Sequence, residues 1–158
     1  MKVHRRVGGR AERGAAAVEF ALVVPLLAML LIGVVTVAVT YNKKIALANG
    51  VREAARVGAT LPSGSSWGTS VKGQFDAAFA EDAADITFCA RLRKVGVVTP
   101  VQTVGTGCGT EPAAASSATG CYVTVWATKP ASMDWVLGRS SFTLTDQSVA
   151  VYDRGQSC

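Results

Sequence analysis

Glu19 is the residue whose position most needs a chemical explanation. It is the only charged side chain among the 29 residues between Arg13 and Lys43. An ionised carboxylate in hydrocarbon costs about 2.5–3.5 kcal/mol on insertion scales, so charges inside membrane segments are usually paired and functional. The alternative is that Glu19, one turn inside the apolar run, lies near enough to the membrane surface to reach water. If it is buried, we expect it to need a cationic partner.

Four cysteines form the second group with possible chemistry, and all lie after the apolar run, at Cys89, Cys108, Cys121 and Cys158. An even number on an oxidising side of a membrane predicts two disulfides. Three pairings are possible. We favour Cys108 with Cys121, which closes an Ala/Ser/Gly-rich loop, and Cys89 with Cys158. Cys121 with Cys158 is the rival if their strands are neighbours.

Catalytic chemistry has little support in the residue types. The only histidine, His4, precedes the apolar run, and no CxxC pair exists, so a zinc site and a hydrolase are both disfavoured. The acidic residues Glu81, Asp82 and Asp85 suit a solvated helix end, and a calcium site there would need further oxygen ligands. No glycine-rich phosphate-binding motif is present. We predict no enzyme, catalytic residue, cofactor, metal or small-molecule substrate.

The element that carries Glu19 is predicted to span a membrane. Of the 158 residues, 49% are hydrophobic and 17% are charged. The run from Phe20 to Tyr41 supplies 22 residues, and a helix needs about 20 to cross a bilayer core. The alternative is a cleaved secretory signal, but the run is long for one, and residues 36–38 (TVA) form a poor cleavage site.

Charge predicts the orientation of that span. The first 14 residues hold five bases and one acid, while the rest holds 11 bases and 10 acids, within a total of +5. This basic tip predicts a cytoplasmic N-terminus and an extracytoplasmic C-terminal part, despite Lys43 and Lys44. A basic tip on a nearly neutral body also makes nucleic acid an unlikely partner.

Hydrophobic periodicity predicts an α+β fold. One long helix is expected over about 15–59, with breakers at 61–66, and an amphipathic helix over 67–83. Strands are expected at 86–92, at 121–127, and at 142–144 with 149–152, plus an irregular edge strand at 97–104. Residues 105–120 form a low-complexity loop. Pro25 and Gly33 are expected to be tolerated within the long helix.

The spacing of Gly14 and Glu19 in RGAAAVEFALVVPLL resembles a type IV prepilin processing site: a basic leader, a glycine, and a glutamate at the fifth mature position. The longer string ERGAAAVEFALVVPLLAMLLIG, with ALANGVREAARVGA after it, resembles the TadE-like family of pilin-like proteins of tight-adherence (Tad, or Flp-type) pili. The resemblance is specific over residues 12 to about 60 and looser beyond.

This resemblance implies processing by a prepilin peptidase between Gly14 and Ala15. Residues 1–14 would be the leader, 15–60 the long helix with a span at about 20–41, and 61–158 a small pilin-like extracytoplasmic α+β domain, its sheet antiparallel. Glu19, followed by Phe20, would serve processing or pair with the new Ala15 amine of a neighbouring subunit and set register.

The implied function is that of a minor pilin or pseudopilin of the bacterial inner membrane. Its partners would be the peptidase, other pilin-like subunits, the assembly machinery and the lipid bilayer. The alternative is a single-span, membrane-anchored binding module that keeps its leader and does not polymerise.

Overall fold

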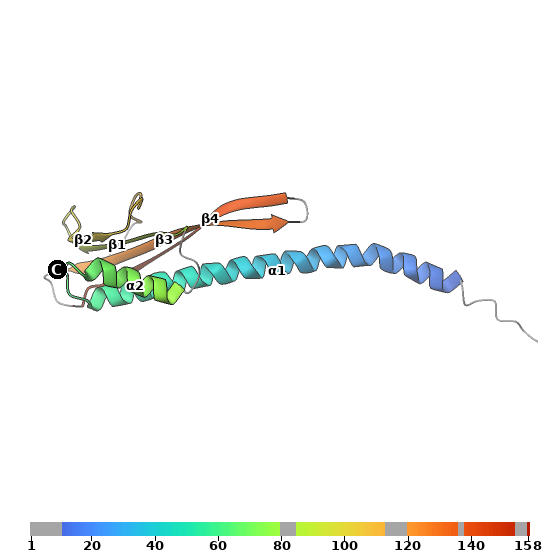
Figure 1. Cartoon of the computed structure of the whole chain (residues 1–158), viewed down its shortest axis with the longest axis horizontal. Helices are drawn as coiled ribbons and strands as arrows, with labels where there is room; N and C mark the ends of the chain where they lie inside the picture. Colours follow the sequence, from blue (N-terminus) through green and yellow to red (C-terminus); the bar gives the residue numbers. More distant parts are fainter. Residues whose placement is uncertain (1–10, 80–84, 113–119, 136–137, 154–157) are drawn as a thin grey trace, which may run out of the picture.

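The computed structural model describes residues 11–79, 85–112, 120–135, 138–153 and 158, and these form one long helix that carries a small α+β domain (Figure 1). The helices are α1 (Ala11–Thr60) and α2 (Trp67–Phe79). The strands are β1 (Thr87–Lys94), β2 (Gln102–Val104), β3 (Cys121–Trp135) and β4 (Gly138–Val151). They form an antiparallel sheet in the order β2-β1-β3-β4, so the predicted α+β class is confirmed.

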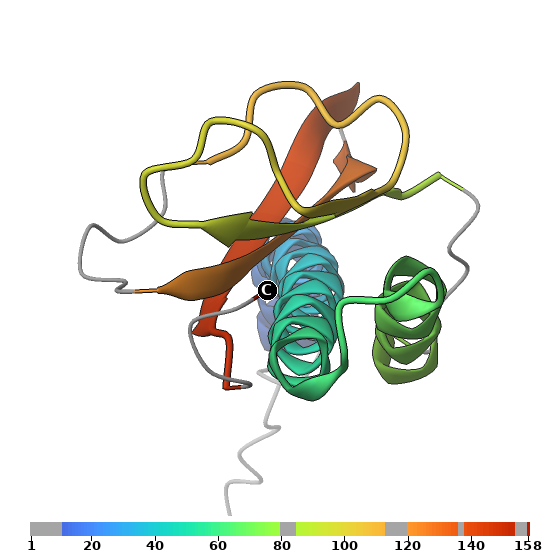
Figure 2. The ribbon, with the colours of Figure 1, turned by 90° about the vertical axis from the view of Figure 1, so that its left-hand side faces the viewer.

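Helix α1 contains 50 residues and is therefore about 75 Å long. It begins four residues before the predicted start, continues through Pro25, and ends at Thr60, just before the predicted breakers. Its C-terminal part packs under the sheet beside α2, whereas its N-terminal part extends alone (Figures 1 and 2). The predicted long helix is confirmed.

The core lies between the two helices and one face of the sheet. The predicted stripe of α2 is buried there, through Trp67, Val71, Phe75 and Phe79. The Phe75 ring lies 5.6 Å from that of Phe79 and 4.6 Å from that of Phe88 on β1. Helix α2 ends at Phe79, and the expected extension to residue 83 lies outside the described residues.

The sheet differs from the prediction mainly at its long hairpin. Strand β4 is continuous, where either one strand or a broken strand was expected, and β3 runs eight residues past the predicted end at 127. Register pairs join Pro130 to Thr143 and Trp135 to Gly138. The arms of this hairpin leave the domain and run alongside α1 (Figure 1). Strand β2 lies at the sheet edge, as expected, but spans three residues.

Candidate functional site

The predicted processing and register residues lie in the first turns of α1. Gly14, Ala15, Glu19 and Phe20 are all exposed, and Phe20 keeps 70% of its surface accessible. A Cβ on Gly14 would meet no atom within 4 Å. No described residue therefore covers this segment against an enzyme or a neighbouring subunit.

The bond between Gly14 and Ala15 lies inside α1, because the helix begins at Ala11. A peptidase that binds an extended substrate would have to unwind this first turn. The cost is low, since the first four N–H groups of a helix lack intrahelical partners and glycine is a poor helix former. The fold therefore leaves the expected cleavage position accessible.

Glu19 lies four residues after Ala15, so both side chains fall on the same face, one turn apart. Among the described residues, Glu19 forms no ion pair. Its carboxylate is thus positioned to pair with a cation supplied from outside the subunit. Its roles in processing and register remain predictions.

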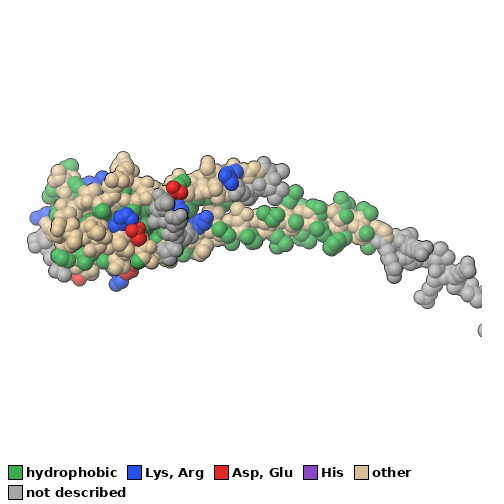
Figure 3. All heavy atoms as spheres, in the orientation of Figure 1, with side chains coloured by type: hydrophobic (Ala, Val, Ile, Leu, Met, Phe, Trp, Pro, Cys, Tyr) green, Lys and Arg blue, Asp and Glu red, His purple; other side chains and the backbone are tan. Residues whose placement is uncertain are grey.

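The helix around Glu19 presents apolar side chains in every direction. Of the 22 large hydrophobic side chains exposed in the described residues, 17 lie between Val18 and Ile45. Helix α1 contains a stretch long and apolar enough to cross a membrane, and none of its most apolar window is buried in the molecule. Figure 3 shows this part as an apolar rod leaving the domain.

The two threonine hydroxyls on this rod are satisfied locally. Thr36 Oγ1 donates to the Ile32 carbonyl at 2.8 Å, and Thr40 Oγ1 donates to the Thr36 carbonyl at 3.0 Å. Hydrogen bonds of this kind remove the cost of placing hydroxyls in hydrocarbon. These two threonines therefore add little cost to placing the rod in lipid.

The C-terminal part of α1 is amphipathic instead. Leu47 and Val51 are buried under the sheet, while Glu53 and Arg56 form an exposed ion pair at 2.7 Å. The hydrogen bond from Arg56 lowers the pKa of the Glu53 carboxyl below its usual value. This part of the helix is thus built for contact with the domain on one side and water on the other.

The two predicted disulfides are present, but the preferred pairing was wrong. Cys89 is bonded to Cys108, and Cys121 is bonded to Cys158, the pair considered as the rival. Alternate residues of a strand point to opposite faces of its sheet. Cys121 joins the core on the helix-facing side, whereas Cys89 points to the outer face, which the loop with Cys108 covers. No cluster of three or more potential metal ligands occurs in the described part of the chain.

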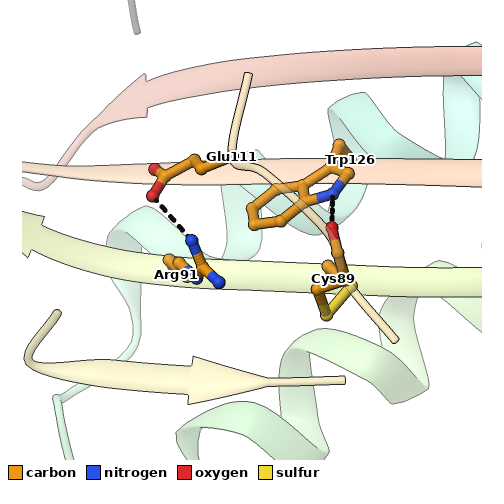
Figure 4. The surroundings of a disulfide bond; sticks show 5 residues. Cys89, Arg91, Glu111 and Trp126 are labelled. Atoms are coloured by element: carbon orange, nitrogen blue, oxygen red, sulfur yellow. Dashed lines mark hydrogen bonds and ion pairs between the residues drawn. A yellow bond between two sulfur atoms is a disulfide. The ribbon is translucent and has the colours of Figure 1, made fainter. Parts of the chain in front are cut away.

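A polar cluster on the outer face of the sheet was missed by the sequence analysis (Figure 4). Glu111 accepts hydrogen bonds from Arg91, at 3.2 Å, and from Arg93. Trp126 Nε1 donates to the Cys108 carbonyl at 3.2 Å, and the Arg91 guanidinium lies 5.2 Å from the Trp126 ring. The sequence feature that could have indicated this cluster is the pair Arg91 and Arg93, which are two residues apart on one strand and so lie on the same face of the sheet. The cluster fixes the loop onto the sheet beside the disulfide.

A bare apolar helix that carries a small disulfide-tied domain is consistent with the class of membrane-anchored, pilin-like proteins. Within that class, residues 14–56 match the family model described as TadE-like protein. The match begins at the predicted cleavage glycine, and it confirms the resemblance over this segment. TadE-like proteins are a structural family associated with Tad pili. No curated protein and no solved structure matches the chain.

Proposed function

We propose that this chain is a minor pilin or pseudopilin that takes part in assembly of a Tad (Flp-type) pilus. A prepilin peptidase removes residues 1–14, and the helix holds the subunit in the inner membrane with its N-terminus in the cytoplasm. The observation that carries this proposal is that the family match falls on a helix whose most apolar window is not buried by any described residue.

An exposed apolar helix is stable either in lipid or against other apolar helices. Leaving the bilayer for a filament exchanges lipid contacts for helix contacts without exposing the rod to water. The chain therefore suits a subunit that is stored in the membrane and later packed with neighbours. Its role is structural, and no reaction is assigned to it.

Glu19 supplies the register of that packing. Cleavage at Gly14 creates a free amine on Ala15, with an ordinary pKa of about 7.7–8.0. A neighbour in the correct axial position pairs this ammonium group with Glu19, and a neighbour shifted along the axis leaves both charges unpaired in an apolar environment. Such pairs specify geometry more reliably than they add stability.

The domain outside the membrane supports a minor subunit. By the family resemblance, major Flp-type subunits are little more than the helix, whereas this chain carries a sheet and a second helix held by two disulfides. Disulfides persist in oxidising compartments, which agrees with an extracytoplasmic location of residues 61–158.

The mature N-terminus is the most direct test. We expect mass spectrometry of protein purified from its native membranes to show a chain that starts at Ala15, with or without a methyl group. A chain that still starts at Met1, or one that starts near residue 39, would contradict the proposal and leave a tethered binding module.

The role of Glu19 is tested by Glu19→Ala, with cleavage and pilus assembly measured separately. We expect pilus assembly to fall sharply, because the register pair is lost. Glu53→Ala is the matched control, since it removes an exposed carboxylate from the domain-packed part of the same helix. Unchanged pili in Glu19→Ala would remove the register role while leaving cleavage to be judged from the mature mass.

A further inference from the structure

A polar crevice lies between α1 and β4, close to the outer end of the expected membrane span. Its volume is about 330 Å³. The lining residues are Tyr41, Lys44, Ile45, Ala48, Asn49 and Arg52 from α1, with Asp146 from β4. They repeat every three or four positions along the helix, so they share one face.

An apolar groove continues this crevice toward the N-terminus of α1. Its volume is about 560 Å³, and its lining residues are Leu30, Gly33, Val34, Val37, Ala38 and Tyr41. Tyr41 belongs to both spaces, so the groove and the crevice are contiguous. The arms of the β3–β4 hairpin run along this part of the helix (Figures 1 and 3). The combined site is apolar at one end and polar at the other.

The polar end has an excess of positive charge. Neither Lys44 nor Arg52 forms an ion pair with any described residue. Asp146 faces them across the crevice, and its Oδ1 accepts a hydrogen bond from the Gln147 backbone N–H at 2.9 Å. Two cations therefore face one carboxylate, and the Asn49 amide adds further donors. This end suits an anion with several acceptor oxygens.

The depth of the site in the bilayer matches an amphiphile. Lys44 lies three residues beyond Tyr41, or about 4.5 Å along the helix axis, within a headgroup layer about 5–8 Å thick. Arg52 lies farther out, but helical side chains lean toward the N-terminus, which here is toward the membrane, and arginine has a long flexible stem. The groove lies at the level of the acyl chains.

We propose that the groove and the crevice together bind one anionic phospholipid of the extracytoplasmic leaflet. Its phosphate lies between Lys44 and Arg52, and one acyl chain lies in the groove along Gly33 and Val37. This assignment rests on the membrane span and orientation of the proposed function, but it requires neither cleavage at Gly14 nor pilus assembly.

The test is native mass spectrometry of the full chain in detergent, titrated with phosphatidylglycerol or with phosphatidylcholine. We expect one phosphatidylglycerol to bind at concentrations where phosphatidylcholine does not. The double variant K44Q/R52Q should bind phosphatidylglycerol about 30-fold more weakly, because each basic residue near an anionic lipid surface contributes about a factor of five. The variant K72Q/K94Q removes the same charge from exposed positions on α2 and β1 that do not line the crevice, and it should bind as the unchanged chain does.

Two further measurements distinguish binding of the whole lipid from binding of its headgroup alone. Gly33→Leu fills the groove without a clash at Cβ, since no described atom outside the local helix backbone lies within 4 Å of that position. It should weaken phosphatidylglycerol binding with both cations intact. Inorganic phosphate at millimolar concentration should not displace the lipid. Equal binding of the two lipids, unchanged binding in K44Q/R52Q or in Gly33→Leu, or full displacement by phosphate would each overturn the proposal.

Discussion

The two halves of α1 belong to one uninterrupted helix but have opposite surroundings. From Gly14 to about Ile45 the side chains are almost all exposed, and from Leu47 to Ala59 one face is buried under the sheet and α2. Both halves are rich in apolar and small residues. What separates them is the distribution of polar residues: the C-terminal half places Asn49, Arg52 and Arg56 on one side only, whereas in the N-terminal half Glu19 is the only charged side chain before Lys43.

This difference shows that the hydrophobicity of a helix does not by itself say what will cover it. A helix with one apolar stripe buries that stripe against its own domain, while one that is apolar around its circumference needs lipid or several neighbours. The transition near Tyr41 and Lys44 therefore divides the surface that packs against the domain from the surface that we propose anchors the subunit.

The largest expected effect comes from deleting the same aromatic ring in the two regions. Phe75→Ala should destabilise the domain by about 3–5 kcal/mol, because Phe75 is fully buried and packs on Phe79 and Phe88. Phe20→Ala should leave domain stability within about 0.5 kcal/mol, because its ring is 70% exposed. Urea unfolding in detergent, followed by tryptophan fluorescence, measures both. A comparable loss of unfolding free energy in the two variants would contradict the division of α1 into a domain-packed half and an exposed half.

Removing the disulfides should destabilise only the domain. Replacing Cys121 and Cys158 with alanine removes a disulfide between residues that are 37 positions apart in the sequence. Replacing Cys89 and Cys108 removes one between residues that are 19 positions apart. The loop-entropy model predicts about 3–4 kcal/mol for each, with the longer loop about 0.6 kcal/mol more costly. Thermal unfolding measures the loss, and the helicity of the membrane segment by circular dichroism in detergent should not change. Equal stability of the reduced and oxidised protein would contradict the prediction.

The smallest effect comes from adding one methyl group to a glycine in each half. Gly58→Ala places a Cβ 3.2 Å from side-chain carbons of Val123 and Val71, so crowding offsets the gain in helix propensity. We expect a loss of about 1 kcal/mol. Gly33→Ala meets nothing within 4 Å and should leave the unfolding midpoint unchanged. A stabilised Gly58→Ala would show that the interface between α1 and the sheet is looser than its distances indicate.

The helices and the membrane segment were predictable because their signals are local. Each signal lies within one stretch of chain: the apolar run, the breakers after Thr60, and the large hydrophobic side chains at every fourth position from Trp67 to Phe79. The family resemblance was predictable for the same reason, since its residues are contiguous.

The features that were missed depend on pairing between distant segments. The extended β3–β4 hairpin contains Pro130 and polar residues on exposed arms, so no hydrophobic alternation marks it as strand. The cysteine pairing depends on which sheet face each cysteine occupies, and that follows from the register of β1 with β3. The contact of Glu111 with Arg91 joins positions 20 residues apart through a loop whose path the sequence does not encode locally.

The last described residues of the chain are bonded to the C-terminal end of α1 and to strand β3. The Asp153 N–H donates to the Ala59 carbonyl at 3.0 Å, the Tyr152 hydroxyl donates to the Leu61 carbonyl at 2.8 Å, and Cys158 is bonded to Cys121. Because β3 and β4 run roughly along α1 (Figure 1), tension on the helix would load their hydrogen bonds in shear, many at once. The mechanical strength of the subunit would then exceed what its modest core alone provides.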